Sequence, residues 1–88
     1  MSAPALDAVS VLVQAIDGFS VRQSVRCLSV AEAVGVAEGW VSPRWSQVSL
    51  TAEGMRGWFA VRHLVADGDG VRDSGWRGWG PDGRFLGE

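Results

Sequence analysis

The cysteine count most limits what this chain can fold into, because Cys27 is the single cysteine among its 88 residues. One thiol supports neither an internal disulfide framework nor a cysteine-based zinc cluster. The fold must therefore rest on one hydrophobic core, and a chain of this length buries about 63% of its unfolded surface. Hydrophobic residues make up 47% of the chain and charged residues 20%, as in folded proteins. We expect a single domain over residues 1–88.

Two helices are predicted in the first half of the chain. Residues 4–17 place apolar side chains three or four positions apart, which is the spacing of one helix face. Residues 30–38 follow a capping box formed by Ser29 and Glu32, and Gly39 is suited to end that helix.

Two further segments also fit helices. Residues 52–66 carry a broad apolar side, and Thr51 can cap their first turn. Residues 20–28 fit either a helix, through a second capping box, or a strand, because apolar and polar side chains alternate there. We favour the helix for residues 20–28 and keep the strand as the alternative.

The remaining segments predict extended structure. Residues 40–50 are expected to form short strands, and seven of the twelve glycines lie in residues 68–88. A turn signal at residues 79–85 predicts a Gly/Trp-rich hairpin over residues 67–88, approached through a flexible Asp67–Gly70 segment. The expected fold class is therefore α+β: a helical body with short strands over residues 1–66, with three to four helices and a small antiparallel sheet, followed by the C-terminal hairpin.

All eight basic residues are arginine, and the chain contains no lysine, asparagine or tyrosine. The missing residue types have AT-rich codons, so this composition indicates a GC-rich bacterial or phage genome. Without lysine, neither a Schiff-base mechanism nor a P-loop is available.

Five tryptophans are too many for a core this small to bury completely. The surplus rings can line the edge of the core, or they can form a contact surface, where Trp and Arg are the residues most enriched. The sequence leaves these two alternatives open.

One cluster near the C-terminus combines tryptophan, arginine and acidic residues. It could close the edge of the core, form a protein interface or, as the third choice, stack on single-stranded nucleic acid. In a strand, Trp76 and Gly78 would face one way, and Arg77 and Trp79 the other. We take the cluster as the candidate partner-binding site: Trp76, Arg77, Trp79, Arg72, Arg84, Asp69 and Asp73.

No residues form a recognisable catalytic set. His63 is expected on the surface near the end of its helix, and Cys27 is expected to be a small buried residue. The acids of residues 67–73 resemble a calcium loop, but Val71 and Gly78 stand where ligands are required. We therefore expect no enzyme activity, no metal and no cofactor.

Residues 20–57 resemble winged-helix DNA-binding regulators. Two capped segments are followed by Gly39-Trp40-Val41 and by Leu50-Thr51-Ala52-Glu53-Gly54, which is similar to the end of the wing in those proteins. The resemblance implies a winged-helix-like fold and, as an alternative function, a dimeric transcriptional regulator that binds DNA. The charges oppose DNA binding, because residues 30–38 carry two carboxylates and no basic side chain and the chain has a net charge of −2.

These properties favour a small non-enzymatic protein that binds a larger protein or protein complex. Its general character is similar to that of phage or mobile-element inhibitors such as anti-CRISPR proteins, which implies steric occlusion of a host nucleic-acid-handling complex. Direct binding to nucleic acid is not expected, and no apolar run approaches the roughly 20 residues that span a membrane. Pro4 and Asp7 stand where a secretory leader would be basic, which favours the cytoplasm. The identity of the partner and the oligomeric state stay open.

Overall fold

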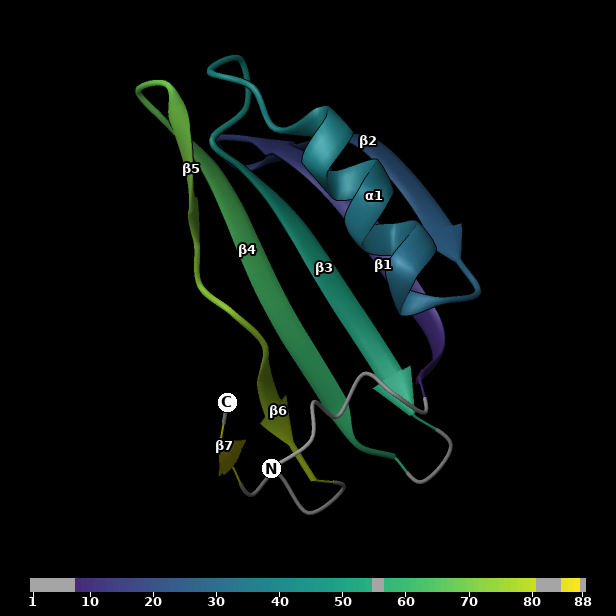
Figure 1. Ribbon diagram of the computed structural model, residues 1–88. Helices are drawn as coiled ribbons and strands as arrows, with labels where there is room; N and C mark the ends of the chain where they lie inside the picture. The colour runs from purple at the N-terminus through teal and green to yellow at the C-terminus, as the bar shows by residue number, and fades with distance from the viewer. Residues whose placement is uncertain (1–7, 55–56, 81–84, 88) are drawn as a thin grey trace.

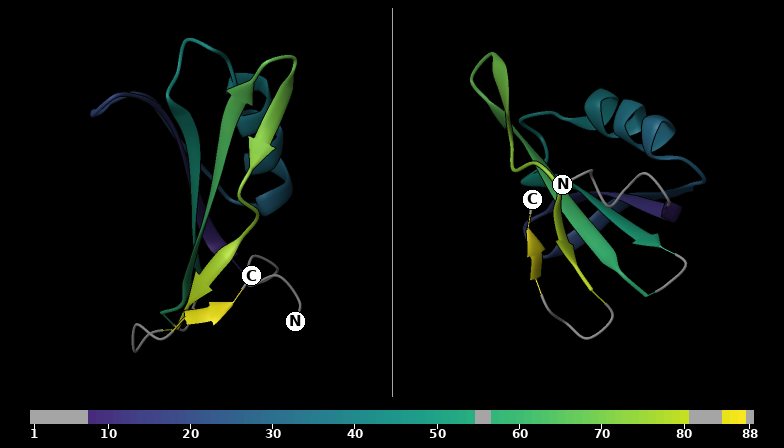
Figure 2. Two further views of the ribbon diagram at one scale, coloured as in Figure 1. Left: turned by 90° about the vertical axis from the view of Figure 1, so that its left-hand side faces the viewer. Right: turned by 60° about the horizontal axis from the view of Figure 1, so that its bottom comes forward.

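The computed structural model describes residues 8–54, 57–80 and 85–87, and these form one antiparallel sheet with a helix on one face (Figures 1 and 2). The strand order is β2-β1-β3-β4-β6-β7, and β5 also pairs with β4. The elements are β1 (Ala8–Asp17), β2 (Ser20–Cys27), α1 (Val30–Trp40), β3 (Gln47–Gly54), β4 (Phe59–Asp67), β5 (Gly70–Asp73), β6 (Arg77–Trp79) and β7 (Phe85–Gly87).

The prediction of three to four helices is wrong, because the described residues contain one helix and are mostly strand. The predicted helix over residues 4–17 is strand β1 from Ala8 onward, and residues 4–7 lie outside the described part. In β1, Val11, Val13 and Ala15 are fully buried. Apolar residues in this segment satisfy a period of two as well as a helical period, and pairing with β2 and β3 favours the strand.

The other two helices predicted outside residues 30–38 are strands as well. Residues 20–28 are largely β2, which was the alternative. Residues 52–66 are divided between the end of β3 and most of β4, which pair with each other as a hairpin. The winged-helix-like arrangement is wrong for the same reason, since residues 20–57 hold one helix between two strands.

Local sequence signals were sufficient to predict α1 and parts of the sheet. Ser29 is the N-cap, and its Oγ accepts the backbone N–H of Glu32 at 3.1 Å. The helix continues one residue past Gly39, to Trp40. The alternating residues 47–50 begin β3, and β6 pairs with β7 as an antiparallel hairpin around residues outside the description.

The segment that follows β4 is a tight turn rather than a flexible approach. Asp67 pairs with Gly70, and Gly68 takes a φ of 61°, a conformation in which glycine is the least strained residue. After β5, Ser74 joins the strand to β4: its backbone N–H donates to the His63 carbonyl at 3.0 Å, and its Oγ accepts the His63 N–H at 2.9 Å. β5 and β6 thus pair with different halves of β4.

The core lies between the sheet and α1. Ala33 and Ala37 of α1 are fully buried, and their small side chains let the helix lie close to the sheet. We call the side of the sheet that α1 covers the helix face and the other side the opposite face (Figure 2). The buried core cluster is Val11, Val13, Cys27, Ala33, Ala37, Val48, Leu50, Ala52 and Leu64.

The connection through α1 determines which strand lies at the edge. The chain leaves β2, crosses the sheet as α1 and enters β3, so β2 and β3 both pair with β1 from its two sides. β2 is consequently the first strand in the order, with one side paired. Within the described residues, no helix is long and apolar enough to cross a membrane.

Candidate protein-binding surface

The sheet divides the predicted partner-binding cluster between its two faces. Trp76 packs against the core cluster on the helix face, with the Arg62 guanidinium 5.8 Å from the ring centroid. Arg62 also donates to both carboxylate oxygens of Asp73, at 3.0 Å from Nε and 2.6 Å from Nη2. Trp76 and Asp73 therefore have partners within the chain, and the Trp76 ring seals one margin of the core.

Arg77 and Trp79 lie on the opposite face, as strand alternation predicts once Gly78 points into the core. The Trp79 ring stacks on Phe59 with centroids 5.2 Å apart and planes inclined by 13°. Arg72 also lies on this face, and it pairs with Asp67 at 3.5 Å.

The last two residues of the predicted cluster are Asp69 and Arg84. Asp69 is exposed in the turn between β4 and β5, and Arg84 lies outside the described residues. The structure brings Arg72, Arg77 and Trp79 to one face, but it does not assemble the whole cluster into one surface.

Sequence reasoning missed an exposed hydrophobic surface along β2. Phe19, in the turn before β2, is fully exposed, and Leu28, directly after β2, is 81% exposed. Val21 and Val25 lie between them and are also exposed. We call these four side chains, together with the side of β2 that pairs with no described strand, the β2 edge surface. Among the described residues, the other large exposed hydrophobic side chains are Phe59 and Val71.

The signal for this surface was present in the sequence but incomplete. The alternation in residues 20–28 indicated a strand, and strand β2 was the alternative interpretation of that segment. The exposure of Val21 and Val25 depends on β2 being an edge strand, and an edge position is set by the order of all the strands.

Arg22 and Arg26 of β2 have different partners within the chain. The Arg26 guanidinium donates to the hydroxyl of Ser10. Arg22 lies near Asp17, with Nε 3.8 Å from the carboxylate, and it borders a hollow that also contains Gln23 and Trp45. A register shift in the β1–β2 pairing places the extra residue of β2 at Arg22, so regular alternation fails there.

The two candidate catalytic side chains are separated by the sheet. Cys27 is buried on the helix face, and its pKa is raised first by burial and then by the hydrogen bond and charge of Glu32. His63 lies in β4, paired in register with Ser49, on the opposite face rather than at a helix end. A raised thiol pKa opposes a nucleophilic role for Cys27. Within the described ranges, no three His, Cys, Asp or Glu side chains are grouped to hold a metal ion.

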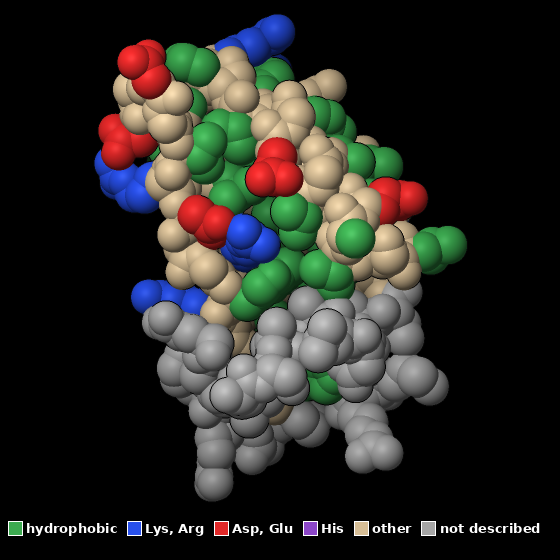
Figure 3. All heavy atoms as spheres, in the orientation of Figure 1, with side chains coloured by type: hydrophobic (Ala, Val, Ile, Leu, Met, Phe, Trp, Pro, Cys, Tyr) green, Lys and Arg blue, Asp and Glu red, His purple; other side chains and the backbone are tan. Residues whose placement is uncertain are grey.

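Acidic and arginine side chains are interspersed with hydrophobic ones on the face drawn in Figure 3. α1 contributes Glu32 and Glu38 to this side and no basic residue. This part of the surface therefore lacks the continuous basic stripe that a nucleic-acid duplex requires. Comparisons with protein-family models, with curated proteins and with solved structures gave no match to the chain.

Proposed function

We propose that this chain is a non-enzymatic protein-binding domain that docks onto a larger protein through the β2 edge surface. One observation carries the proposal: four of the six large hydrophobic side chains exposed in the described residues lie in β2 or directly beside it. Exposed hydrophobic side chains and unpaired backbone groups on one strand are the two properties that a neighbouring strand would satisfy together.

The geometry favours docking by strand addition. The register shift at Arg22 places Val25 on the helix face and Val21 on the opposite face, so a partner segment paired with the backbone of β2 would cover them with side chains that alternate between its two faces. Phe19 and Leu28 at the two ends of β2 would extend the contact beyond the strand. An interface of about 800 Å² on each partner is typical of specific complexes.

The charges indicate what kind of partner fits. α1 packs across the sheet beside β2 and carries Glu32 and Glu38 without a basic residue, and the whole chain has a net charge of −2. β2 itself carries Arg22 and Arg26, so the part of the molecule that complements a basic protein surface is α1 and not the docking strand. We therefore keep the proposal of an inhibitor of the anti-CRISPR type, acting in the bacterial cytoplasm by covering a nucleic-acid-handling surface.

The test compares two valines of equal exposure on different strands. Val21 on β2 is 51% exposed and Val71 on β5 is 54% exposed, so lysine at either position costs the fold equally little. A partner is captured from a host lysate with the tagged wild-type chain and then purified, and its affinity is measured by calorimetry. We expect Val21→Lys and Phe19→Ser to weaken binding by at least about tenfold and Val71→Lys to leave it unchanged.

Three outcomes would contradict the proposal. Equal binding by the Val21→Lys and Val71→Lys variants would exclude the β2 edge surface. Sedimentation showing that Val21→Lys abolishes only self-association would reassign the surface to a second copy of the chain. Tight binding to duplex DNA that weakens steeply with salt would favour the DNA-binding alternative.

A further inference from the structure

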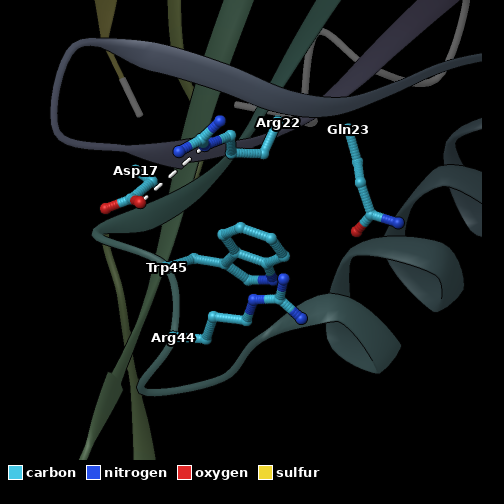
Figure 4. A pocket seen from close by; sticks show the side chains of 5 residues that line it. All are labelled: Asp17, Arg22, Gln23, Arg44 and Trp45. Carbon is cyan, nitrogen blue, oxygen red and sulfur yellow. Dashed lines mark ion pairs between the residues drawn. The ribbon is translucent and has the colours of Figure 1, made fainter.

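A second surface feature adjoins the β2 edge surface: a hollow of about 420 Å³ at the end of the sheet where β1 turns into β2. Arg22 and Gln23 extend into it from β2, and Arg44 and Trp45 reach it from the loop between α1 and β3 (Figure 4). Asp17 completes the lining. Its volume lies in the range of small-molecule sites.

Hydrogen bonds hold the two walls of the hollow together. Ser46 accepts the backbone N–H of Gly18 on its Oγ at 2.7 Å and donates its own N–H to the Ile16 carbonyl at 2.7 Å. Within the loop, the backbone N–H of Trp45 donates to the Ser42 carbonyl, and the backbone N–H of Arg44 donates to the Ser42 Oγ, both at 3.1 Å. The loop that carries Arg44 and Trp45 is therefore anchored to the β1–β2 turn before any ligand arrives.

The lining combines a flat aromatic ring with two guanidinium groups. The Arg44 guanidinium lies 4.8 Å from the centroid of the Trp45 ring, and in Figure 4 the indole lies between Arg44 below and Arg22 above. Arg22 approaches Asp17 through Nε at 3.8 Å, which is longer than a hydrogen bond. Two cations against one carboxylate leave the hollow with a net positive charge.

We propose that this hollow binds a mononucleotide. The base would enter between the Trp45 ring and Arg22, because both present flat surfaces that stack on a nucleobase. The Gln23 side chain both donates and accepts hydrogen bonds, as the edge of a base requires. The Arg44 guanidinium, which does not stack on the base in this arrangement, would bind the phosphate.

Size and charge distinguish a nucleotide from the nearest other ligands. A free phosphate or a single carboxylate would use the guanidinium groups but would leave most of the hollow and the indole without a contact. A longer nucleic-acid strand would need further cations along its path, whereas the chain as a whole has a net charge of −2. A single nucleotide needs only the charges that line the hollow.

The test uses the full chain and a panel of four 5′-nucleoside monophosphates, with binding measured by isothermal titration calorimetry. We expect at least one of them to bind saturably with a Kd of about 1 mM or tighter. Arg44→Gln and Trp45→Leu should each weaken that binding by about tenfold or more. The matched control is Arg26→Gln, which removes a guanidinium from the same strand outside the hollow and should leave the affinity unchanged.

Asp17→Asn should change the nucleotide affinity in the opposite direction, and this distinguishes a role in ligand binding from a structural role. Removing this carboxylate relieves Arg22 of its competing partner, so the variant should bind the nucleotide about threefold more tightly. A residue that merely supported the fold would weaken binding or leave it unchanged when replaced.

Further titrations identify which part of the nucleotide is recognised. The matching nucleoside and inorganic phosphate, each tested alone, should bind at least about tenfold more weakly than the nucleotide. The proposal is overturned if inorganic phosphate binds as tightly as the nucleotide, if no nucleotide saturates the chain at about 10 mM, or if Arg26→Gln weakens binding as much as Arg44→Gln. A single-stranded hexanucleotide that binds more than about tenfold tighter than the monomer would also overturn it, in favour of a nucleic-acid strand.

Discussion

Two glycines of this chain are expected to respond to alanine in opposite directions. A Cβ atom on Gly54 would overlap the Trp58 indole, which packs over this position and against the core. Gly35 lies in α1 with nothing within 4 Å of the position that its Cβ would take. We expect Gly54→Ala to lower the free energy of unfolding by about 1–3 kcal/mol and Gly35→Ala to raise it by about 0.5–1 kcal/mol. Urea titrations followed by circular dichroism measure both, and equal effects would contradict the packing described for Trp58.

The Asp73 carboxylate gives the stability a pH dependence of defined sign. The Asp73 pKa lies below its usual value, chiefly because of the hydrogen bond from Arg62, with burial opposing this and the Gly75 N–H adding to it. A folded-state pKa below the unfolded one contributes stability above the unfolded pKa, near about 4, and that contribution is lost as the pH falls through the folded-state pKa. Asp73→Asn should therefore be less stable than wild type at neutral pH and lose less stability on acidification. Parallel curves of unfolding free energy against pH would exclude this role.

Cys27 should behave as a structural thiol. It is 2% exposed, and burial and Glu32 raise its pKa, so both access and thiolate formation oppose its reaction. We expect a thiol reagent such as iodoacetamide to modify native Cys27 no faster than the chain unfolds, and to modify it rapidly in urea. Fast labelling of the native chain, measured by mass spectrometry, would contradict this account and would reopen a nucleophilic role.

At the scale of single elements, α1 shows how a local signal can be sufficient. Its N-terminus depends on the Ser29 Oγ, which accepts the Glu32 N–H. We expect Ser29→Ala to lower the stability by about 1 kcal/mol and Ser29→Asp to retain it, because aspartate also caps helices. Thermal unfolding of the two variants measures the difference, and equal losses would show that the cap is not the cause.

The strands show why the rest of the fold could not be predicted from local patterns. Val13 belongs to both a helical and an alternating set of apolar residues, so hydrophobic spacing alone does not decide between them. What decides is pairing: Val13 lies opposite Val25 on one side and Leu50 on the other, and those partners are 12 and 37 positions away in the chain. Such pairings leave no local signature comparable with a helix cap.

The candidate sites also contain some features that local sequence predicts and others that depend on the whole sheet. Alternation in a strand was enough to separate Trp76 from Arg77 and Trp79, whereas the exposure of Val21 and Val25 required the order of strands in the sheet. The hollow around Trp45 was harder to predict from the sequence, because its lining comes from the β1–β2 hairpin and from a loop that follows α1 in the chain. Neither segment has a motif that refers to the other.

For the whole molecule, the topology should set the folding rate. The central pairing of β1 with β3 closes a loop of the chain that contains β2 and α1, so much of the sheet depends on contacts distant in sequence. Domains of this kind fold in roughly milliseconds to seconds, more slowly than helical bundles of equal length. Stopped-flow refolding followed by tryptophan fluorescence measures the rate, and relaxation within about 100 µs would contradict the influence of these distant pairings.

The insertion of β1 between β2 and β3 also has a consequence for biosynthesis. The β1–β2 hairpin emerges from the ribosome before β3 does, so the side of β1 that β3 later covers stays vacant while α1 emerges. Val11 and Val13 have no cover from β3 during that interval, and the β1–β2 hairpin then has an open edge along β1 as well as along β2. Binding of chaperones to the nascent chain should therefore peak while the β1–β2 hairpin is exposed without β3, and fall once β3 has emerged from the ribosome.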